Sequence, residues 1–445
     1  MLGDALRAAF AAAALAGAAA NAAEPEPGPP AAEAAPAAEA EGAAAPERTR
    51  FNLEFGWDAG PTYALVQRFP EIQQYAPVGL VKDIFLVGRI GGSLYLDGGY
   101  LGGDALDNGF DGRVRRARFF TRGTFTHWFP TEYKFEFAVE SSRVFLNDFF
   151  LRWRFSRWID SLRFGYFDPP VSLEALASSA ERSLMEVGAP VGAFAPGYRL
   201  GIEADGTSAE HGLTWGANVS TVGQAQETAD ASTSDFRATG RLVWRPWGDA
   251  EPEPTALLHL GLSLQYTFAG SGQIQYRARP ESFLAPYVVD TGPIESGGAT
   301  LLGLEAAWRH GPVSIQAEYF GSFVDGNDAG ARVFQGAYVQ ASWVLTGEQR
   351  PYDRSTALFG RVEAREPFAP LRGSWGALEV AWRLSWLTLS DGPVRGGRLV
   401  VATVGPAWVL NRWVRIEAGY VAAVIRDRPG GSHAQIFQAR LELRL

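Results

Sequence analysis

Several residue types and patterns are scarce in this chain, and each scarcity excludes a class of protein. The 445 residues include no Cys, which excludes a disulfide framework and a thiolate site but is compatible with an oxidising compartment. Lys82 and Lys134 are the only lysines, and neither lies in the context of a phosphate-binding P-loop. No apolar stretch is long enough to cross a membrane as a helix.

Histidine is also rare, and its placement argues against catalysis and metal binding. The five histidines lie mostly near turns and never at metal-ligand spacing, so we interpret them as solvated loop residues: His127, His211, His259, His310 and His433. No Ser or Asp pairs with a His in a way that would support a hydrolase. The sequence therefore predicts no catalytic residue, no metal and no cofactor.

The abundant pattern is a strict alternation of apolar and polar residues in segments of about ten residues. In the last segment, Phe437 and Leu441 lie on one face and Arg440 lies on the other. Such a strand buries one face in an apolar medium. Seventeen segments show the pattern, at residues 84–97, 113–126, 132–140, 145–155, 160–167, 198–206, 211–222, 235–246, 256–268, 273–289, 299–310, 312–323, 333–345, 376–389, 396–410, 412–426 and 434–445.

These segments predict an all-β protein, a transmembrane antiparallel β-barrel whose polar face lines a pore. A closed sheet is needed because lipid cannot satisfy the backbone groups of an open edge. Barrels of this kind have even strand numbers, so one segment is superfluous, and 273–289 is the weakest. We expect 16 strands, a size that leaves an aqueous channel. The mean hydropathy of -0.08 agrees, because alternation hides the membrane face from an average.

The residues before the first strand divide into three parts. Residues 1–22 end in the small-x-small pattern Ala20-Asn21-Ala22, which predicts a cleaved signal peptide. Residues 23–49 are rich in Ala, Pro and Glu and predict a disordered periplasmic tether, with a binding arm as the alternative. Residues 50–83 form an extension that could hold a short hairpin, and residues 84–445 form the barrel.

Long and short connections should alternate along a barrel, with the long ones on the outside. Short periplasmic turns are predicted at 128–131 and 155–158, with tryptophans in the aromatic belt. The connections at 98–112, 141–144 and 168–197 then fall on the outer side. The last of these is the long one, between the fifth and sixth strands.

Five short motifs between residues 110 and 205 carry a family resemblance: Phe110–Arg118, Tyr133–Phe137, Gly165–Glu174, Glu181–Ser183 and Ala193–Gly201. In this order and spacing they resemble the phosphate-selective porin O and P family. The resemblance implies a sixteen-stranded trimeric barrel, a third loop folded into the lumen, and arginines that guide anions to a constriction. The family's phosphate site resembles a cluster of lysine and arginine, whereas this chain has two lysines and places Asp168 where many members carry a basic residue.

Arginines recur on the polar faces of neighbouring segments and predict a basic wall. In 113–126, Val114 shares a side with Arg116 and Arg118. A charge on the lipid face costs roughly 2–4 kcal/mol at the midplane, so these arginines should face water. Guanidinium groups bind oxyanions through two parallel hydrogen bonds. The predicted pore-lining residues are Arg116, Arg118, Arg122, Arg152, Arg154, Arg163, Arg182 and Arg199.

Acidic residues accompany this wall. Glu174, Glu181 and Glu186 lie in the third loop, and if that loop folds inward we expect them at the constriction, opposite the wall. Acids on the wall itself, such as Glu136 and Glu203, could instead pair with the arginines as ion networks without a transport role.

The sequence thus predicts an outer-membrane porin of a Gram-negative bacterium, a channel for passive diffusion of small hydrophilic solutes with a modest preference for anions such as chloride or phosphate. The alternatives are a general or cation-preferring porin, and a structural or adhesive barrel with a blocked lumen. The expected partners are outer-membrane lipid and lipopolysaccharide and two further copies in a homotrimer. The net charge of -9 disfavours nucleic acid.

Overall fold

The computed structural model describes most of the chain from residue 50 onward. The predicted signal peptide (1–22) and tether (23–49) lie outside the described residues. The described ranges are 50–57, 61–68, 82–125, 130–140, 143–155, 158–222, 235–247, 254–270, 272–326 and 330–445.

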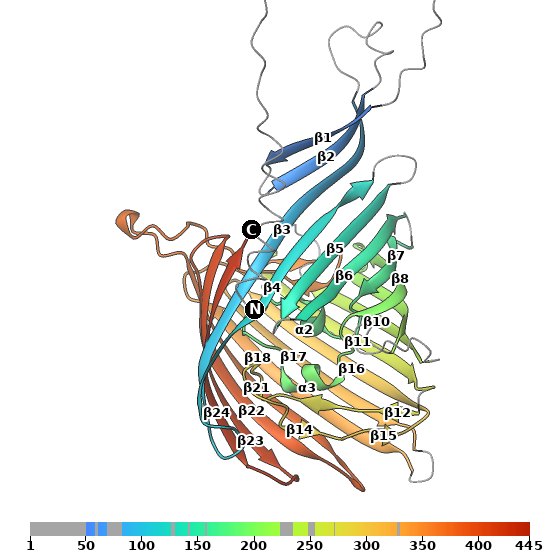
Figure 1. Ribbon diagram of the computed structural model, residues 1–445, viewed down its shortest axis with the longest axis vertical. Coiled ribbons are helices and arrows are strands. Elements are labelled where there is room, and N and C mark those ends of the chain that lie inside the picture. Colours follow the sequence, from blue (N-terminus) through green and yellow to red (C-terminus); the bar gives the residue numbers. More distant parts are fainter. Residues whose placement is uncertain are drawn as a thin grey trace, which may run out of the picture. The chain divides into compact units, whose positions relative to one another are not determined.

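Antiparallel strands close into one barrel (Figure 1). They are β3 (Lys82–Gly102), β4 (Gly109–Phe125), β5 (Thr131–Glu140), β6 (Arg143–Arg154), β7 (Ser161–Phe167), β8 (Arg199–Ser208), β9 (Leu213–Thr221), β10 (Phe236–Trp247), β11 (Ala256–Phe268), β16 (Gly298–His310), β17 (Val313–Val324), β18 (Arg332–Val344), β21 (Ala377–Asp391), β22 (Val394–Val409), β23 (Val414–Arg426) and β24 (His433–Arg444). Each pairs with the next, and β24 pairs with β3 to close the ring. Within the described residues the ring has the predicted 16 strands.

Two further strands precede the ring in the same sheet. β1 (Arg50–Trp57) and β2 (Pro61–Arg68) are antiparallel to each other, and β2 pairs with the start of β3. The 18-stranded sheet therefore contains the closed ring and this pair.

The segment 273–289 is not a barrel strand, which confirms it as the superfluous one of the seventeen segments. It belongs to an inserted loop, 269–297, which holds only two-residue strands: β12 (Gln273–Ile274), β13 (Arg277–Ala278), β14 (Val289–Asp290) and β15 (Ile294–Glu295). Pro280 and Pro286 explain the difference, because proline cannot donate to a strand ladder.

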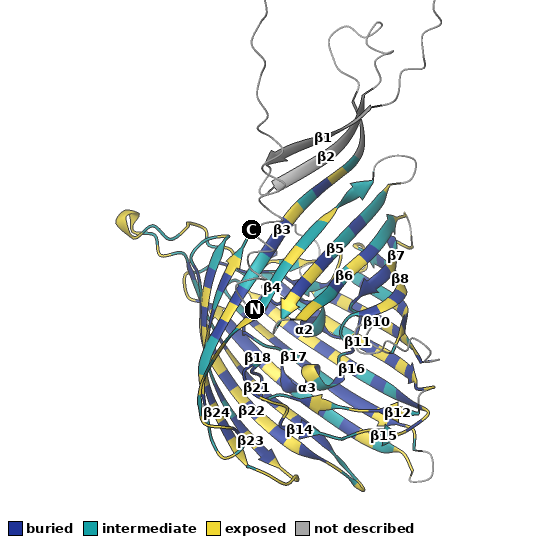
Figure 2. Ribbon diagram, viewed as in Figure 1, coloured by how far each residue is buried: buried dark blue, intermediate teal, exposed yellow. Residues whose placement is uncertain are grey.

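The faces of the strands have the predicted sidedness (Figure 2). On β11, Leu262 and Leu264 are 47% and 54% exposed, whereas Ser263 between them is 2% exposed because it faces the filled lumen. Among the described residues, no helix is long and apolar enough to cross a membrane.

A β-bulge corrects the predicted face of one residue on β4. The register shifts where Tyr95 pairs with Arg116 and Leu96 pairs with Val114, which leaves Arg115 as the extra residue. Val114 is consequently 40% exposed on the outer face, whereas Arg115 is buried inside. The alternation in the sequence does not reveal this register shift, because the shift arises from the pairing of β4 with β3.

Three long loops fill much of the lumen. Residues 168–198, with helices α2 (Leu173–Leu176) and α3 (Ala189–Phe194), and the loop 269–297 enter from the end opposite the start of β3 and the end of β24. We call the end with the β3 start and the β24 end the terminal end. The loop 345–376, with β19 (Tyr352–Asp353), β20 (Leu358–Phe359) and the 3-10 helix η2 (Pro370–Arg372), lies at the terminal end. The expectation that long connections occupy only one end is therefore wrong.

These loops pack an apolar core inside the barrel. Phe194 of α3 contacts the rings of Tyr276 and Phe320, with centroids 5.1 and 6.1 Å apart. Inward residues of β18 and β21, including Phe334 and Leu387, are fully buried against the same cluster. The lumen is therefore narrowed by packed side chains rather than by polar loops alone.

Candidate functional site

Four of the predicted arginines lie on the neighbouring lumenal wall of β4, β6 and β7. Each of these four has an acid on an adjacent strand. Arg118 lies 3.4 Å from Glu136, and Arg163 lies 2.5 Å from Glu203. Arg116 pairs with Glu140, and Arg152 lies 3.9 Å from Glu132. The wall is therefore partly neutralised by its own ion pairs.

Two predicted wall arginines lie near the rim at the terminal end rather than in the narrow part. Arg154, the last residue of β6, is 53% exposed at its side chain and pairs with Glu132 at 2.8 Å. Arg122, close to the end of β4, is exposed, and its guanidinium lies 5.6 Å from the ring of Phe120. Both are exposed to solvent, which screens their charge.

The third loop folds into the lumen, as the family resemblance implies, and its first helix is fixed by a carboxylate from the wall. Ser172 caps α2 by accepting a hydrogen bond from the backbone N–H of Ala175. The buried Glu318 of β17 accepts from the N–H groups of Leu173 and Glu174, at 3.0 and 2.9 Å. Two orphan donors at the start of the helix are thereby satisfied.

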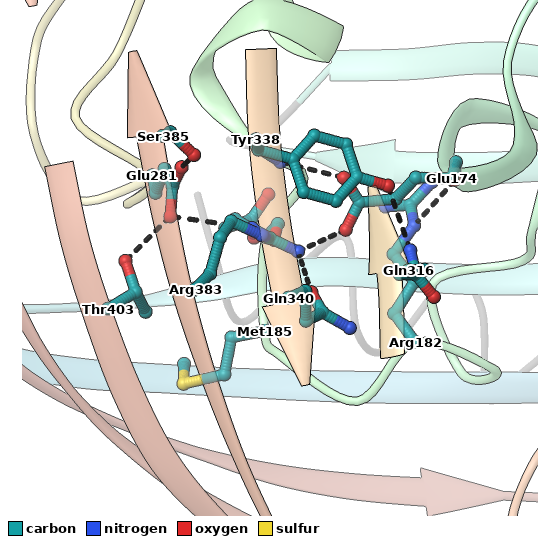
Figure 3. A network of polar contacts seen from close by, with 12 residues as sticks. Glu174, Arg182, Met185, Glu281, Gln316, Tyr338, Gln340, Arg383, Ser385 and Thr403 are labelled. Carbon is teal, nitrogen blue, oxygen red and sulfur yellow. Dashed lines mark hydrogen bonds and ion pairs between the residues drawn. The ribbon is translucent and has the colours of Figure 1, made fainter. Parts of the chain in front are cut away.

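Glu174 continues the attachment toward β21 (Figure 3). Its carboxylate pairs with Arg383 and accepts from the N–H of Gly188. Arg383 also donates to Gln340 at 2.5 Å and lies 3.4 Å from Glu281. Its side chain has no exposed surface. Because these charges are buried, the network is sensitive to the loss of any one member.

Glu186 attaches the far side of the same loop. It pairs with Arg115 of β4 at 3.0 Å and with Arg440 of β24 at 2.7 Å. These two guanidinium groups hold the pKa of Glu186 far below its usual value, despite burial. Glu181 instead accepts from the N–H of Ser178 within the loop.

Two of the three loop acids are paired with arginines of the barrel wall. Glu174 and Glu186 are engaged by arginines on β4, β21 and β24, and Glu181 closes a local turn. A loop inside a barrel must satisfy its polar groups on the wall, which explains the pairing of Glu174 and Glu186. That the three acids line the constriction stays a prediction.

The wall and the loop meet around Asp168. Burial and the neighbouring Asp148 raise the pKa of the Asp168 carboxyl to about 7, although Arg182, Arg199 and Arg163 act in the opposite direction. Arg182 donates to the carbonyls of Glu174 and Ala175, at 3.3 and 3.5 Å. Burial lowers the pKa of Arg182. Three predicted arginines, from two strands and one loop, thus act on the pKa of a single carboxyl.

A model of the phosphate-selective porin O and P family matches residues 89–445. The chain belongs to that family. It is 26% identical to Porin O of Pseudomonas aeruginosa over 315 residues, 63% of this chain and 70% of the relative. Its fold is similar to two solved structures, the anion-selective porin from Comamonas acidovorans (13% identity, TM-score 0.51) and the loop L8 deletion mutant of OmpT, an outer membrane protein of Vibrio cholerae (10% identity, TM-score 0.52). Each is matched over 81% of this chain and all of the other. The protein is thus an outer-membrane porin of a Gram-negative bacterium.

Sequence reasoning missed the arginines that anchor the loops of this porin. The missed residues are Arg115, Arg350, Arg383, Arg415 and Arg440. For Arg383, Arg415 and Arg440, an inward position in the alternation was a usable signal, since Arg440 was already placed on the polar face of its strand. That signal does not say which loop group each one meets. Arg350 had no such signal, because it lies in the loop 345–376 and donates to the carbonyl of Glu181 at 3.0 Å.

One histidine also differs from its predicted setting. His259 is not a solvated loop residue but a fully buried residue of β11, 3.0 Å from Glu305 and 2.7 Å from the hydroxyl of Tyr352. Arg241 completes this group by pairing with Glu305 at 2.7 Å and donating to the carbonyl of Ala357. The group fixes the loop 345–376 to the wall of the porin.

Proposed function

We propose that this porin passes small hydrophilic solutes by passive diffusion and prefers small anions such as chloride. Arg182 of the third loop carries the proposal, because its guanidinium donates to the neutral backbone carbonyls of Glu174 and Ala175. The carboxylates of Glu174 and Glu186 in the same loop are paired with Arg383 and Arg440. Charges in a narrow throat with low-dielectric walls focus their field on a passing ion, so the positive charge of Arg182 favours anions.

We propose that phosphate binds weakly. Arg163 is engaged by Glu203, and the lysine on this wall, Lys134, lies 2.5 Å from Asp148 and 3.2 Å from Glu136. Cations that already have acid partners offer fewer donors to a ligand. A tight site would need several donors free at the same point.

Ion selectivity in planar bilayers tests the proposal, by the reversal potential in a KCl gradient. We expect chloride to be preferred, and Arg182→Gln to lower the ratio of chloride to potassium permeability. A unit charge about 5 Å from the ion path changes the free energy of each ion by roughly 0.8 kcal/mol even at the dielectric constant of water. The sign is opposite for chloride and potassium, so the ratio should change by about 1.7 kcal/mol, or on the order of tenfold. The matched control is Arg122→Gln near the rim, which should leave the ratio unchanged.

Three outcomes would contradict the proposal. A cation-selective protein before mutation would show that the acids dominate the throat, and a general porin would be the better description. Tight block of chloride current by phosphate would show that arginines alone suffice for a phosphate site. An absence of current would favour a structural barrel with a closed lumen, the candidate suggested by the three loops that pack inside the ring.

We further propose a homotrimer that has no enzymatic activity, sits in lipid and lipopolysaccharide, and has its terminal end in the periplasm. Support for the trimer comes from the trimer form of Vibrio cholerae OmpT, whose fold matches with a TM-score of 0.51. Light scattering that accounts for bound detergent should give three copies, and a monomer would contradict this. We also propose that residues 1–22 are a signal peptide and 23–49 a tether, and the N-terminal sequence of the mature protein tests the cleavage site.

A further inference from the structure

The loop 345–376 leaves the lumen in its last third and forms a small hairpin outside the ring. We call residues 366–375 the tip segment. A bridge between Ala369 and Ser374 closes it, and η2 lies between them. Gly373 ends η2 with a φ of 77°, a left-handed conformation that suits glycine. The hydroxyl of Ser374 also donates to the carbonyl of Pro367 at 2.8 Å. The tip segment is therefore a defined turn with its own hydrogen bonds.

Aromatic contacts seat the tip segment on the outer, apolar face of the barrel. The indole N–H of Trp408 donates to the carbonyl of Trp375 at 2.7 Å. The ring of Phe368 lies 5.2 Å from Trp408 and 5.8 Å from Trp375, in edge-to-face arrangements. Trp408 follows Val404 at even spacing on β22, and Val404 is 44% exposed on the outer face. The base of the tip segment is thus continuous with the membrane-facing surface.

The apolar end of the tip segment is not covered by the other residues that the structure describes. Leu371 is 102% exposed and Trp375 is 61% exposed. In Figure 1 the segment is the orange loop that projects sideways at the left, near the ends of β22 and β24. A fully exposed leucine at the end of a hydrogen-bonded turn leaves apolar surface in water unless another phase takes it up.

Exposed tryptophans at the ends of several strands mark the level of the membrane interface at the terminal end. β10, β16 and β18 all end at the terminal end, and each carries an exposed tryptophan within its last three residues: Trp247, Trp308 and Trp343. Tryptophan prefers the boundary between headgroups and acyl chains. Trp408 holds the corresponding place near the end of β22, and it is the residue that holds the tip segment.

We propose that the tip segment is a membrane-interface anchor that inserts Leu371 and Trp375 among the lipids of the leaflet at the terminal end. The occupant of this surface is the headgroup and acyl-chain boundary of a phospholipid layer. Arg372 at the end of η2 is exposed and stands beside the inserted leucine, in reach of phosphate groups. Interfacial segments of this kind bury their apolar side by about 5–10 Å.

A single label tests the proposal, because the chain contains no Cys. Leu371→Cys carries a polarity-sensitive dye in the full porin, reconstituted in phosphatidylethanolamine and phosphatidylglycerol vesicles with nitroxide lipids. The nitroxide is placed either near the headgroup or in the middle of the acyl chain. Val404→Cys serves as the control within the membrane, and Pro429→Cys serves as the aqueous control, in an exposed turn at the opposite end.

We expect blue-shifted emission at position 371 and stronger quenching by headgroup nitroxides than by mid-chain nitroxides, with the reverse order at position 404. The quenched fraction at 371 should exceed that at 429 on the order of twofold or more. Quenching no stronger than at 429 would overturn the proposal. Blue-shifted emission that nitroxide lipids do not quench, and that is lost when the oligomer dissociates, would also overturn it and assign the surface to a second copy.

Discussion

Removal of Arg383 should release the third loop from the barrel wall. Arg383→Met keeps most of the side-chain length but removes the donors to Glu174, Gln340 and Glu281. It also removes the bond to the carbonyl of Glu186, at 2.9 Å. Two buried carboxylates then lose their cation. Breaking a buried ion pair in this way costs about 3–5 kcal/mol.

Two measurements follow this change. Urea unfolding of the barrel, monitored by the loss of the compact form on unheated gels, should show the lower stability. Planar-bilayer recording should show a larger and noisier conductance, because Glu174 no longer holds α2 in the lumen. Replacing Glu174 by Gln in the same chain should recover part of the stability, since one of the unpaired charges is removed. A coupling of more than about 1 kcal/mol is expected between residues in one network.

The matched control is Arg398→Met. Arg398 pairs with Asp427 at 2.8 Å, but the two side chains are 59% and 38% exposed, so its loss should cost about 0–1 kcal/mol. If Arg383→Met lowers the free energy of unfolding no more than this control does, and the conductance is unchanged, the network does not hold the third loop against the wall.

Further changes address the register, the constriction and the cap of α2. Leu262→Arg should impair assembly, because it places a charge in lipid at a cost of roughly 2–4 kcal/mol, while the apolar change Leu262→Phe should assemble; equal yields of folded barrel would refute the register. Because protonation of Asp168 removes a negative charge among arginines, the chloride preference should rise as the pH falls through about 7, and Asp168→Asn should abolish that dependence in reversal-potential titrations. Glu318→Gln leaves one oxygen acceptor for two helix donors, so urea unfolding should show a loss of about 1–3 kcal/mol, and an unchanged midpoint would contradict the capping role.

The barrel could be predicted from the sequence because each strand separates two media. Because lipid lies outside and a polar lumen inside, apolar and polar residues alternate with a period of two in every strand. The inward and outward residues of β11 and β24 can therefore be assigned from the sequence of each strand alone. The superfluous segment 273–289 shows the limit of this signal, because alternation occurs there with only two-residue ladders and prolines interrupt it.

The attachments inside the barrel were decided only by the tertiary structure. Glu174 meets Arg383, and Glu186 meets Arg440, across more than two hundred residues, because closing the sheet brings β21 and β24 beneath a loop that leaves β7. Alternation could place Arg440 on the polar face, but it could not name its partner. The bulge that turns Arg115 inward likewise depends on the pairing of β4 with β3. Local periodicity is a property of one strand and its surroundings, whereas ion pairs depend on where the whole chain returns.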